Sequence, residues 1–199
     1  MSTQALSLQR IRAVVIGASA GGVEALRNLL PALPAELAVP IFVVLHLPRE
    51  SRSLLIEIFS PLCELQVREA RDKDPIAPGT IYFAPSDYHL LLDTGPQLAL
   101  SVDAAVNFSR PSIDVLFESA ADVYQQQLMG VILTGSNHDG AAGLAAVRRA
   151  GGITVVQNPS SAMVPEMPMA ALRSGPADFV LTLDEMVELL KTLNREVQT

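Results

Sequence analysis

The sequence predicts an α/β fold: a doubly wound, mostly parallel sheet flanked by helices. Short apolar runs such as residues 11–16 (IRAVVI) and 128–135 (LMGVILTG) lack polar alternation, which indicates strands covered on both faces. Segments with helical spacing separate these runs, and strand–helix alternation implies right-handed crossovers. Hydrophobic residues make up 49% of the chain but aromatic residues only 5%, so the core must consist of Ala, Val, Leu and Ile.

The first third of the chain predicts strand, helix, strand and short helix in turn. Their ranges are residues 11–16, 21–33, 40–47 and 51–59, the last with a serine N-cap. Four short strands between Gly, Pro and Asp signals follow, and they predict an inserted antiparallel patch around residues 65–102.

The α/β alternation then returns. We expect a helix capped by Ser112, followed by elements at residues 128–135, 139–152, 153–157, 167–175, 178–183 and 183–197. No internal repeat or low-complexity linker divides the sequence, so we expect a single domain over residues 1–199, with loose ends at 1–10 and 195–199.

Composition excludes several functional classes. The net charge of −7 argues against a nucleic-acid partner. No window approaches 18 unbroken apolar residues, so we expect no membrane insertion and a cytoplasmic location. A single cysteine, Cys63, excludes an internal disulfide and is expected to pack as a small apolar residue. One Cys with three His makes a structural zinc site a poor expectation, and no metal or cofactor is predicted.

The turn Gly17–Gly22 (GASAGG) has two interpretations. A dinucleotide fingerprint would need glycine where Ser19 stands, and an acidic residue at the end of the second strand, where Leu45-His46-Leu47 is found. Residues 17–21 (GASAG) match the pattern G-x-S-x-G, which is typical of a turn that holds a nucleophilic serine. It places Ser19 at a helix N-terminus, where outward N–H groups, including that of Ala20, favour developing negative charge.

A nucleophilic serine needs a base and an acid. His46 closes the strand that follows the Ser19 turn, and sites in open α/β sheets form at the carboxyl ends of strands. Asp139 follows a third buried strand, where it also suits a helix N-cap. Of the other histidines, His89 is expected at a solvated strand position, and His138 is adjacent to Asp139, a poor arrangement for side-chain pairing.

Five segments carry a family resemblance. They are VVIGASAGGVEAL (14–26), VVLHLP (43–48), YFAPSDYHLLLD (82–93), NFSRPSIDVLFESAA (107–121) and GVILTGSNHDGAAGL (130–144). Together, in this order, they resemble the catalytic domain of the chemotaxis protein-glutamate methylesterases, the CheB family. The resemblance implies a doubly wound α/β domain that hydrolyses glutamate methyl esters on chemoreceptor helices, deamidates certain receptor glutamines and needs no cofactor. The family's catalytic residues match Ser19, His46 and Asp139.

The sequence departs from the family at two places. Ala20 stands where Thr is frequent, and Ser136-Asn137 stands where Met-Gly is frequent. The resemblance implies that the backbone N–H of Ser136 belongs to the oxyanion hole, so a changed side chain there need not abolish activity. Larger members carry an N-terminal receiver domain. Only about ten residues precede the first strand here, so we expect control to be absent or to come from another protein, such as a separate response regulator.

The expected partners are methylated cytoplasmic helices of chemoreceptors. Arg110 is the candidate for contacting their acidic surface, with a solvated loop arginine as the alternative. Met163, Met167 and Met169 are candidates for either the site rim or the core. Two further functions stay open: a non-catalytic signalling module on the same fold, which a fluorophosphonate would not label at Ser19, and a generic hydrolase of small esters.

Overall fold

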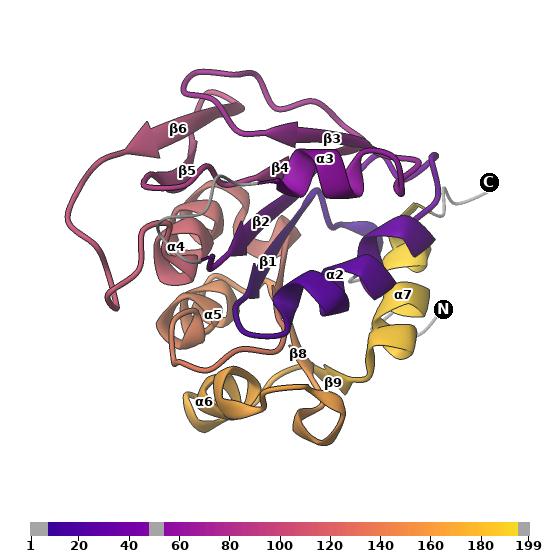
Figure 1. Ribbon diagram of the computed structural model, residues 1–199, viewed down its shortest axis with the longest axis vertical. Helices are drawn as coiled ribbons and strands as arrows, with labels where there is room; N and C mark the ends of the chain where they lie inside the picture. Colours follow the sequence, from indigo (N-terminus) through magenta and orange to yellow (C-terminus); the bar gives the residue numbers. More distant parts are fainter. Residues whose placement is uncertain (1–7, 48–53, 195–199) are drawn as a thin grey trace.

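The computed structural model describes residues 8–47 and 54–194, and its centre is a seven-stranded sheet. All strand pairs in this sheet are parallel, in the order β3-β4-β2-β1-β7-β8-β9. The strands are β1 (Ala13–Ala18), β2 (Ile41–Leu45), β3 (Gln66–Glu69), β4 (Thr80–Phe83), β7 (Leu128–Ile132), β8 (Ile153–Gln157) and β9 (Phe179–Leu181). The predicted doubly wound α/β fold is thereby confirmed (Figure 1).

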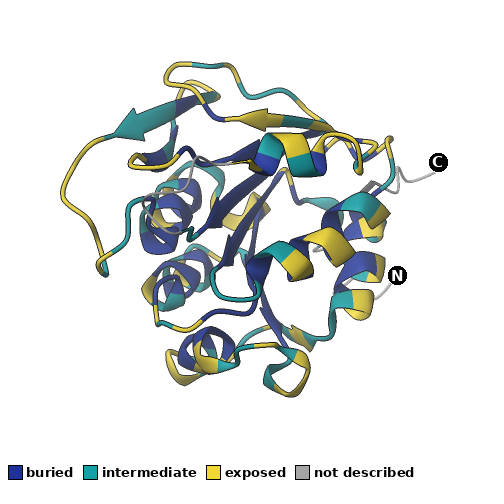
Figure 2. Ribbon diagram, in the orientation of Figure 1, coloured by how far each residue is buried: buried dark blue, intermediate teal, exposed yellow. Residues whose placement is uncertain are grey.

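Helices cover both faces of the sheet, which gives three layers. They are α2 (Gly22–Leu29), α3 (Leu55–Phe59), α4 (Ile113–Tyr124), α5 (Ala141–Arg149), α6 (Glu166–Arg173) and α7 (Leu183–Lys191), with 3₁₀ turns at Leu30–Ala32, Gln125–Gln127, Pro159–Ser161 and Thr192–Asn194. One apolar core joins the sheet to α2, α3 and α7, and a second joins it to α4, α5 and α6. Figure 2 shows the buried sheet between partly exposed helices.

Strand β1 shows why its residues are apolar without alternation. Val14 and Ile16 point into the first core, whereas Ala13 and Val15 point into the second. A central parallel strand covered on both faces must be apolar at every position, because neither side meets water. The low aromatic content fits the same arrangement, since the two cores are filled largely by aliphatic side chains.

The antiparallel insertion is smaller than the range around residues 65–102 that the sequence predicts. Among the described residues, the two strands that pair antiparallel are β5 (His89–Asp93) and β6 (Gln97–Ser101), in a separate two-stranded sheet. Strands β3 and β4 instead extend the parallel sheet beyond β2. Both strands are short and are flanked by turn residues, which is also typical of an antiparallel meander. In this fold, however, the connections before them cross over, so that both strands run in the same direction as β2.

The ends and caps also differ in part from expectation. Arg10, in the segment expected to be loose, donates hydrogen bonds to the Gly151 carbonyl (3.1 Å) and Gln126 Oε1 (3.4 Å). The expected serine N-cap in residues 51–53 and the segment 195–199 lie outside the described residues. Helix α7 has an unpredicted capping box, in which Thr182 and Glu185 bond one another reciprocally.

Candidate active site

The turn after β1 holds Ser19 half-buried, directly before helix α2. The Ser19 N–H donates to the Thr134 carbonyl (3.0 Å), and the Gly22 N–H donates to the Ser19 carbonyl (2.8 Å). The Thr134 hydroxyl donates to the Ala20 carbonyl (2.9 Å), so the loop after β7 fixes the residue that follows the serine. Gly21 has φ = 79°, which is why the turn requires glycine there.

A second glycine brings helix α4 close to β1. A Cβ added to Gly17 would overlap the side chain of Ile113, the first residue of α4. Glycine at this position therefore lets the N-terminus of α4 approach the carboxyl end of β1. This approach matters because the backbone N–H of Ile113 belongs to the hydrogen-bond network described below.

His46 follows the neighbouring strand, as the sequence predicts. The register of β1 and β2 pairs Ala18 with Leu45, and the His46 N–H donates to the Ala18 carbonyl (3.0 Å). Ser19 and His46 are therefore the next residues on adjacent parallel strands, at the same edge of the sheet. The His46 side chain is 11% exposed, so its ring is largely shielded but open on one side.

Asp139 is fully buried and accepts a dense set of hydrogen bonds. His46 Nε2 lies 2.9 Å from Asp139 Oδ2. The Ser112 hydroxyl (2.8 Å), Asn107 Nδ2 (2.9 Å) and the Ile113 N–H (2.7 Å) donate to the same carboxylate. Burial alone would raise the pKa of Asp139, but the bonds from His46, Asn107, Ile113 and Ser112 lower it below its ordinary value.

This environment determines which imidazole nitrogen can act as a base. Because Asp139 is an ionised acceptor, Nε2 of a neutral His46 carries the hydrogen and Nδ1 keeps the lone pair. Asn137 Nδ2 lies 3.3 Å from that Nδ1. Within residues 8–47 and 54–194 the Ser19 hydroxyl makes no hydrogen bond. Apo geometry of this kind is compatible with a base that receives its proton only in the substrate complex.

The backbone donors expected for an oxyanion are available. Among the described residues, neither the Ala20 N–H nor the Ser136 N–H bonds a protein acceptor. Thr134 links the two segments that carry these donors. Its hydroxyl donates to the Ala20 carbonyl, and its carbonyl accepts from the Ser19 N–H. The turn that holds Ser19 and the turn that leads to Asp139 are thus joined through Thr134, and each keeps a backbone N–H without a partner among the described residues.

Two expected helix caps have different partners. Helix α5 takes Gly140 as its N-cap, so Asp139 does not cap the helix that follows it. Its carboxylate instead accepts from the N-terminus of α4, through the N–H groups of Ile113 (2.7 Å) and Asp114 (3.2 Å). Ser112 is the N-cap residue of α4 as predicted, but its hydroxyl donates to Asp139 rather than capping its own helix.

The prediction of a solvated His89 is wrong, because its ring is only 2% exposed. His89 Nδ1 accepts from the Ser112 N–H (3.2 Å), and Nε2 lies 3.1 Å from the Ala104 carbonyl. The ring therefore supports Ser112, which in turn bonds Asp139. His138 is exposed beside the site, and no hydrogen bond joins it to Asp139 within the described chain.

Arg110 holds a loop in this structure. Its Nη1 donates to the carbonyls of Val102 (2.8 Å) and Asp103 (3.1 Å), and its Nη2 lies 3.8 Å from Asp87 Oδ1. The side chain is 29% exposed. Its predicted contact with an acidic receptor surface stays a prediction, because the structure holds no partner chain.

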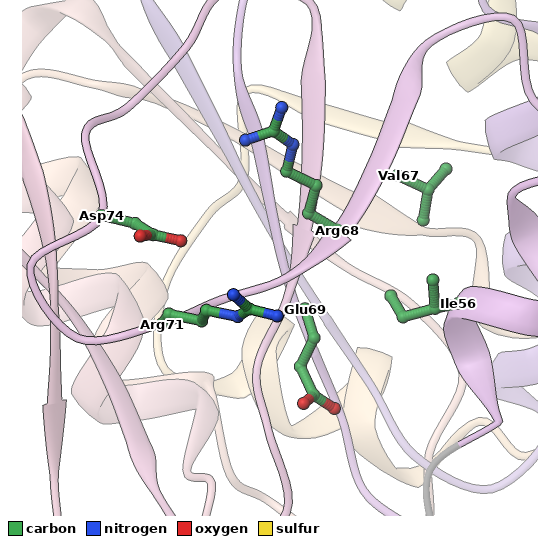
Figure 3. Close-up of a pocket in the computed structure, with 6 residues that line it drawn as sticks. All are labelled: Ile56, Val67, Arg68, Glu69, Arg71 and Asp74. Carbon is green, nitrogen blue, oxygen red and sulfur yellow. The ribbon is translucent and has the colours of Figure 1, made fainter.

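Two cavities differ in their relation to Ser19. One of about 350 Å³ lies against the serine turn, with Gly21, Thr134 and the 68%-exposed Met163 in its wall. Met167, by contrast, is buried in the core at 1% exposure. The other cavity, of about 410 Å³, lies at edge strand β3, where β4 and β2 separate it from β1. Its lining combines apolar side chains with charged ones: Ile56, Val67, Arg68, Glu69, Arg71 and Asp74 (Figure 3).

Cys63 packs as an apolar residue and is not a second nucleophile. Burial raises the pKa of Cys63 to about 11, so its thiol is protonated at neutral pH, and it packs against the first core. Within residues 8–47 and 54–194 there is no cluster of three His, Cys, Asp or Glu that could hold a metal ion. No helix among these residues is long and apolar enough to cross a membrane.

Comparison with known proteins identifies the family. The family model described as CheB methylesterase matches residues 14–190. The chain belongs to the CheB methylesterase family. The solved CheB methylesterase catalytic domain of Thermotoga maritima is 34% identical, with a TM-score of 0.87, and the match covers 92% of this chain and 98% of that one. As a member of this family, the protein is an ester hydrolase.

Curated CheB-type relatives differ in length. A Leptospira interrogans protein is 44% identical over 92% of this chain and 95% of its own length. Proteins from Symbiobacterium thermophilum (39% identical) and Caulobacter vibrioides (38% identical) match 90% and 94% of this chain but only 49% and 55% of their own lengths. Both of these are named protein-glutamate methylesterase/protein-glutamine glutaminase.

Sequence reasoning missed four polar residues around the predicted triad. Two of them, Asn107 and Ser112, donate hydrogen bonds to Asp139. The third, His89, accepts from the Ser112 N–H, and the fourth, Asn137, contacts His46. Asn107 and Ser112 belong to the polar run NFSRPS before α4, and this run of polar residues leading into a helix at the site edge was the available signal. His89 gave no signal of its own, because a histidine at the start of the strand HLLLD can face either solvent or the core.

Proposed function

We propose that this protein hydrolyses glutamate γ-methyl esters on chemoreceptors in the cytoplasm, and converts receptor glutamines to glutamates, as part of sensory adaptation. The names of the curated relatives support this substrate class. The observation that carries the proposed chemistry is the 2.9 Å contact between His46 Nε2 and the buried Asp139, which leaves Nδ1 as a base beside the Ser19 turn.

In the proposed first half-reaction, Ser19 Oγ attacks the γ-carbonyl carbon while its proton passes to His46 Nδ1. The carbonyl π electrons move to oxygen, and the N–H groups of Ala20 and Ser136 receive the oxyanion. Each such donor contributes about 3 kcal/mol in comparable sites. When the carbonyl re-forms, the methoxy group leaves with the proton from His46 as methanol.

In the second half-reaction, Nδ1 takes a proton from water as the water oxygen attacks the acyl carbon. Collapse of this intermediate returns the proton to Ser19 Oγ and frees the glutamate side chain of the receptor. Asp139 keeps Nε2–H in place and stabilises the imidazolium that forms in both halves. For a glutamine substrate, ammonia replaces methanol as the leaving group, and the other steps are the same.

Methanol release from a methylated chemoreceptor tests this proposal. Ser19→Ala is expected to lower kcat by at least about 10⁴-fold, because triad members act as a unit. A fluorophosphonate should label Ser19 in the wild type but leave Ser19→Ala unlabelled. Wild-type rates in Ser19→Ala would overturn the assignment of the nucleophile. Equal turnover of receptor and a simple methyl ester would indicate a generic esterase, and no turnover with no labelling would indicate a non-catalytic module.

A further inference from the structure

Asn137 lies in the turn after β7, two residues before Asp139, with its amide orientation fixed by a backbone bond. Its Oδ1 accepts from the Asp139 N–H (3.1 Å), and only the oxygen end of an amide can accept from an N–H. The amide nitrogen must therefore face the other way. There it lies 3.3 Å from His46 Nδ1.

The same imidazole nitrogen is required for catalysis. Nε2–H is directed at Asp139, so Nδ1 is the only ring nitrogen with a lone pair, and it has one acceptor direction in the ring plane. In the free enzyme the Asn137 amide occupies that direction. The Ser19 hydroxyl makes no hydrogen bond within the described residues, which agrees with a base that is already engaged.

We propose that Asn137 supplies a side-chain N–H to the oxyanion, and that in the free enzyme this donor rests on His46 Nδ1. The inference rests on the proposed triad. Nδ1 can take the Ser19 proton only after the amide has left this lone pair, and once protonated it is a donor that cannot accept from the amide again. The released amide is then without an acceptor when the substrate oxygen gains negative charge.

The distances permit this exchange. Proton transfer requires Ser19 Oγ within about 2.6–3.2 Å of Nδ1, and the oxyanion is bonded to the carbon that Oγ attacks. An amide nitrogen 3.3 Å from the same Nδ1 therefore lies on the side of the ring where this oxygen would form. Ser136, whose N–H is the expected backbone donor, directly precedes Asn137 in the chain. Asparagine side chains are suitable oxyanion donors.

Two variants separate the donor role from the role in the turn. Asn137→Ala removes both the amide and the bond to the Asp139 N–H. Asn137→Ser removes the amide, but a serine hydroxyl can still accept from the N–H two residues on. We expect kcat for hydrolysis of a peptide γ-methyl ester to fall about 10²-fold in both variants, as for loss of one oxyanion donor. KM should change less than about threefold, because the contact forms only in the transition state.

A kcat at or above the wild-type value in Asn137→Ala would overturn the inference, because Asn137 would then only obstruct the base. Recovery of kcat in Asn137→Ser would also overturn it, by showing that the turn alone matters. Ser19→Ala measured alongside distinguishes this failure from failure of the proposed function. If Ser19→Ala is inactive while the Asn137 variants are unimpaired, only the present inference fails. If Ser19→Ala is active, the triad itself is wrong.

Discussion

Asp139 caps helix α4, which contains Asp114, and Asp114 caps helix α5, which begins two residues after Asp139. Asp139 accepts from the N–H groups of Ile113 and Asp114 at the start of α4. Asp114 Oδ1 accepts from the N–H groups of Gly140 (2.9 Å) and Gly143 (2.6 Å) at the start of α5. Both carboxylates thus lie at the positive ends of helix dipoles.

Asn107 links the two acids. Its Nδ2 donates to Asp114 Oδ2 (2.8 Å) and to Asp139 Oδ1 (2.9 Å). The pKa values of the two carboxylates nevertheless shift in opposite directions. Burial is the main cause that raises the pKa of Asp114, and the charge of Asp139 raises it further. The hydrogen bond from the Gly143 N–H lowers this pKa but does not offset the rise. The pKa of Asp139 is lowered. Because of this difference, the charge is favoured on the acid that contacts His46.

Replacing Asp114 should loosen both helix starts. We expect Asp114→Ala to lower the free energy of unfolding by about 2–4 kcal/mol, because the buried N–H groups of Gly140 and Gly143 lose their acceptor. Urea denaturation measures this. The control is Asp122→Ala on the exposed face of the same helix, which should change stability by less than about 0.5 kcal/mol. Equal effects of the two substitutions would show that the reciprocal capping contributes nothing.

Asp139 should make stability depend on pH in acid. Its pKa is lower in the folded state than the ordinary value of about 3.9, so the unfolded chain binds more protons between the two values. Its contribution is therefore complete above the unfolded-state pKa and is lost as pH falls through the folded-state pKa. We expect wild type to exceed Asp139→Asn by about 1–3 kcal/mol at pH 6, and this difference to shrink below pH 4.

Urea titrations of both proteins between pH 6 and pH 2.5 measure that difference. Asp122→Asn serves as the exposed control and should show no such trend. Asp114 has a raised pKa, so its contribution has the opposite sign. The part of that rise caused by burial, the largest cause, is present in both proteins and cancels, whereas the part caused by the Asp139 charge is absent from Asp139→Asn. A difference that grows on acidification would contradict the assignment of Asp139 as the ionised partner.

A methyl group on Gly21 should disturb the serine turn more than the fold. Gly21 has φ = 79°, and an added Cβ would lie 2.9 Å from Met163 Cβ and 3.1 Å from Thr134 Oγ1. We expect Gly21→Ala to lower kcat/KM about 10²-fold, since small displacements of reacting groups have effects of that size. Met163→Gly in the same chain removes both the Cβ and the Sδ that the new methyl group would meet, and should restore part of the loss. Gly95→Ala, where the nearest atoms are the Gln97 side chain, should leave esterase kinetics unchanged.

Substitutions of Arg110 distinguish two roles: attraction of its charge to an acidic receptor surface, and anchoring of the loop that contains Val102 and Asp103. Its two bonds to the Val102 and Asp103 carbonyls are both donated by Nη1, while Nη2 lies 3.8 Å from Asp87 Oδ1. The single ammonium nitrogen of lysine, on a side chain without the planar guanidinium, does not reproduce this arrangement. We expect Arg110→Lys and Arg110→Ala to raise KM for the receptor by similar factors, about 3–10-fold, because each releases the loop (about 0.7–1.4 kcal/mol). Full recovery by lysine would instead support direct attraction to an acidic receptor surface.

The sequence by itself determined five of the seven sheet strands, namely β1, β2, β7, β8 and β9, and the triad candidates. Apolar runs without alternation marked the covered strands, and polar residues at strand ends marked Ser19, His46 and Asp139. These signals are local, because each depends on a strand and the few residues that follow it. Parallel strands place their carboxyl ends at one edge, so separate local signals there converge on one site.

Only the tertiary structure decided what surrounds the triad. Asp139 and His46 are 93 residues apart, and the bonds from Asn107, Ser112 and His89 also join distant segments. A buried polar group must be paired, but the sequence does not reveal which groups are buried together. For this reason His89 was placed in solvent, β3 and β4 were placed in the antiparallel patch, and the contact between Asn137 and His46 was not foreseen.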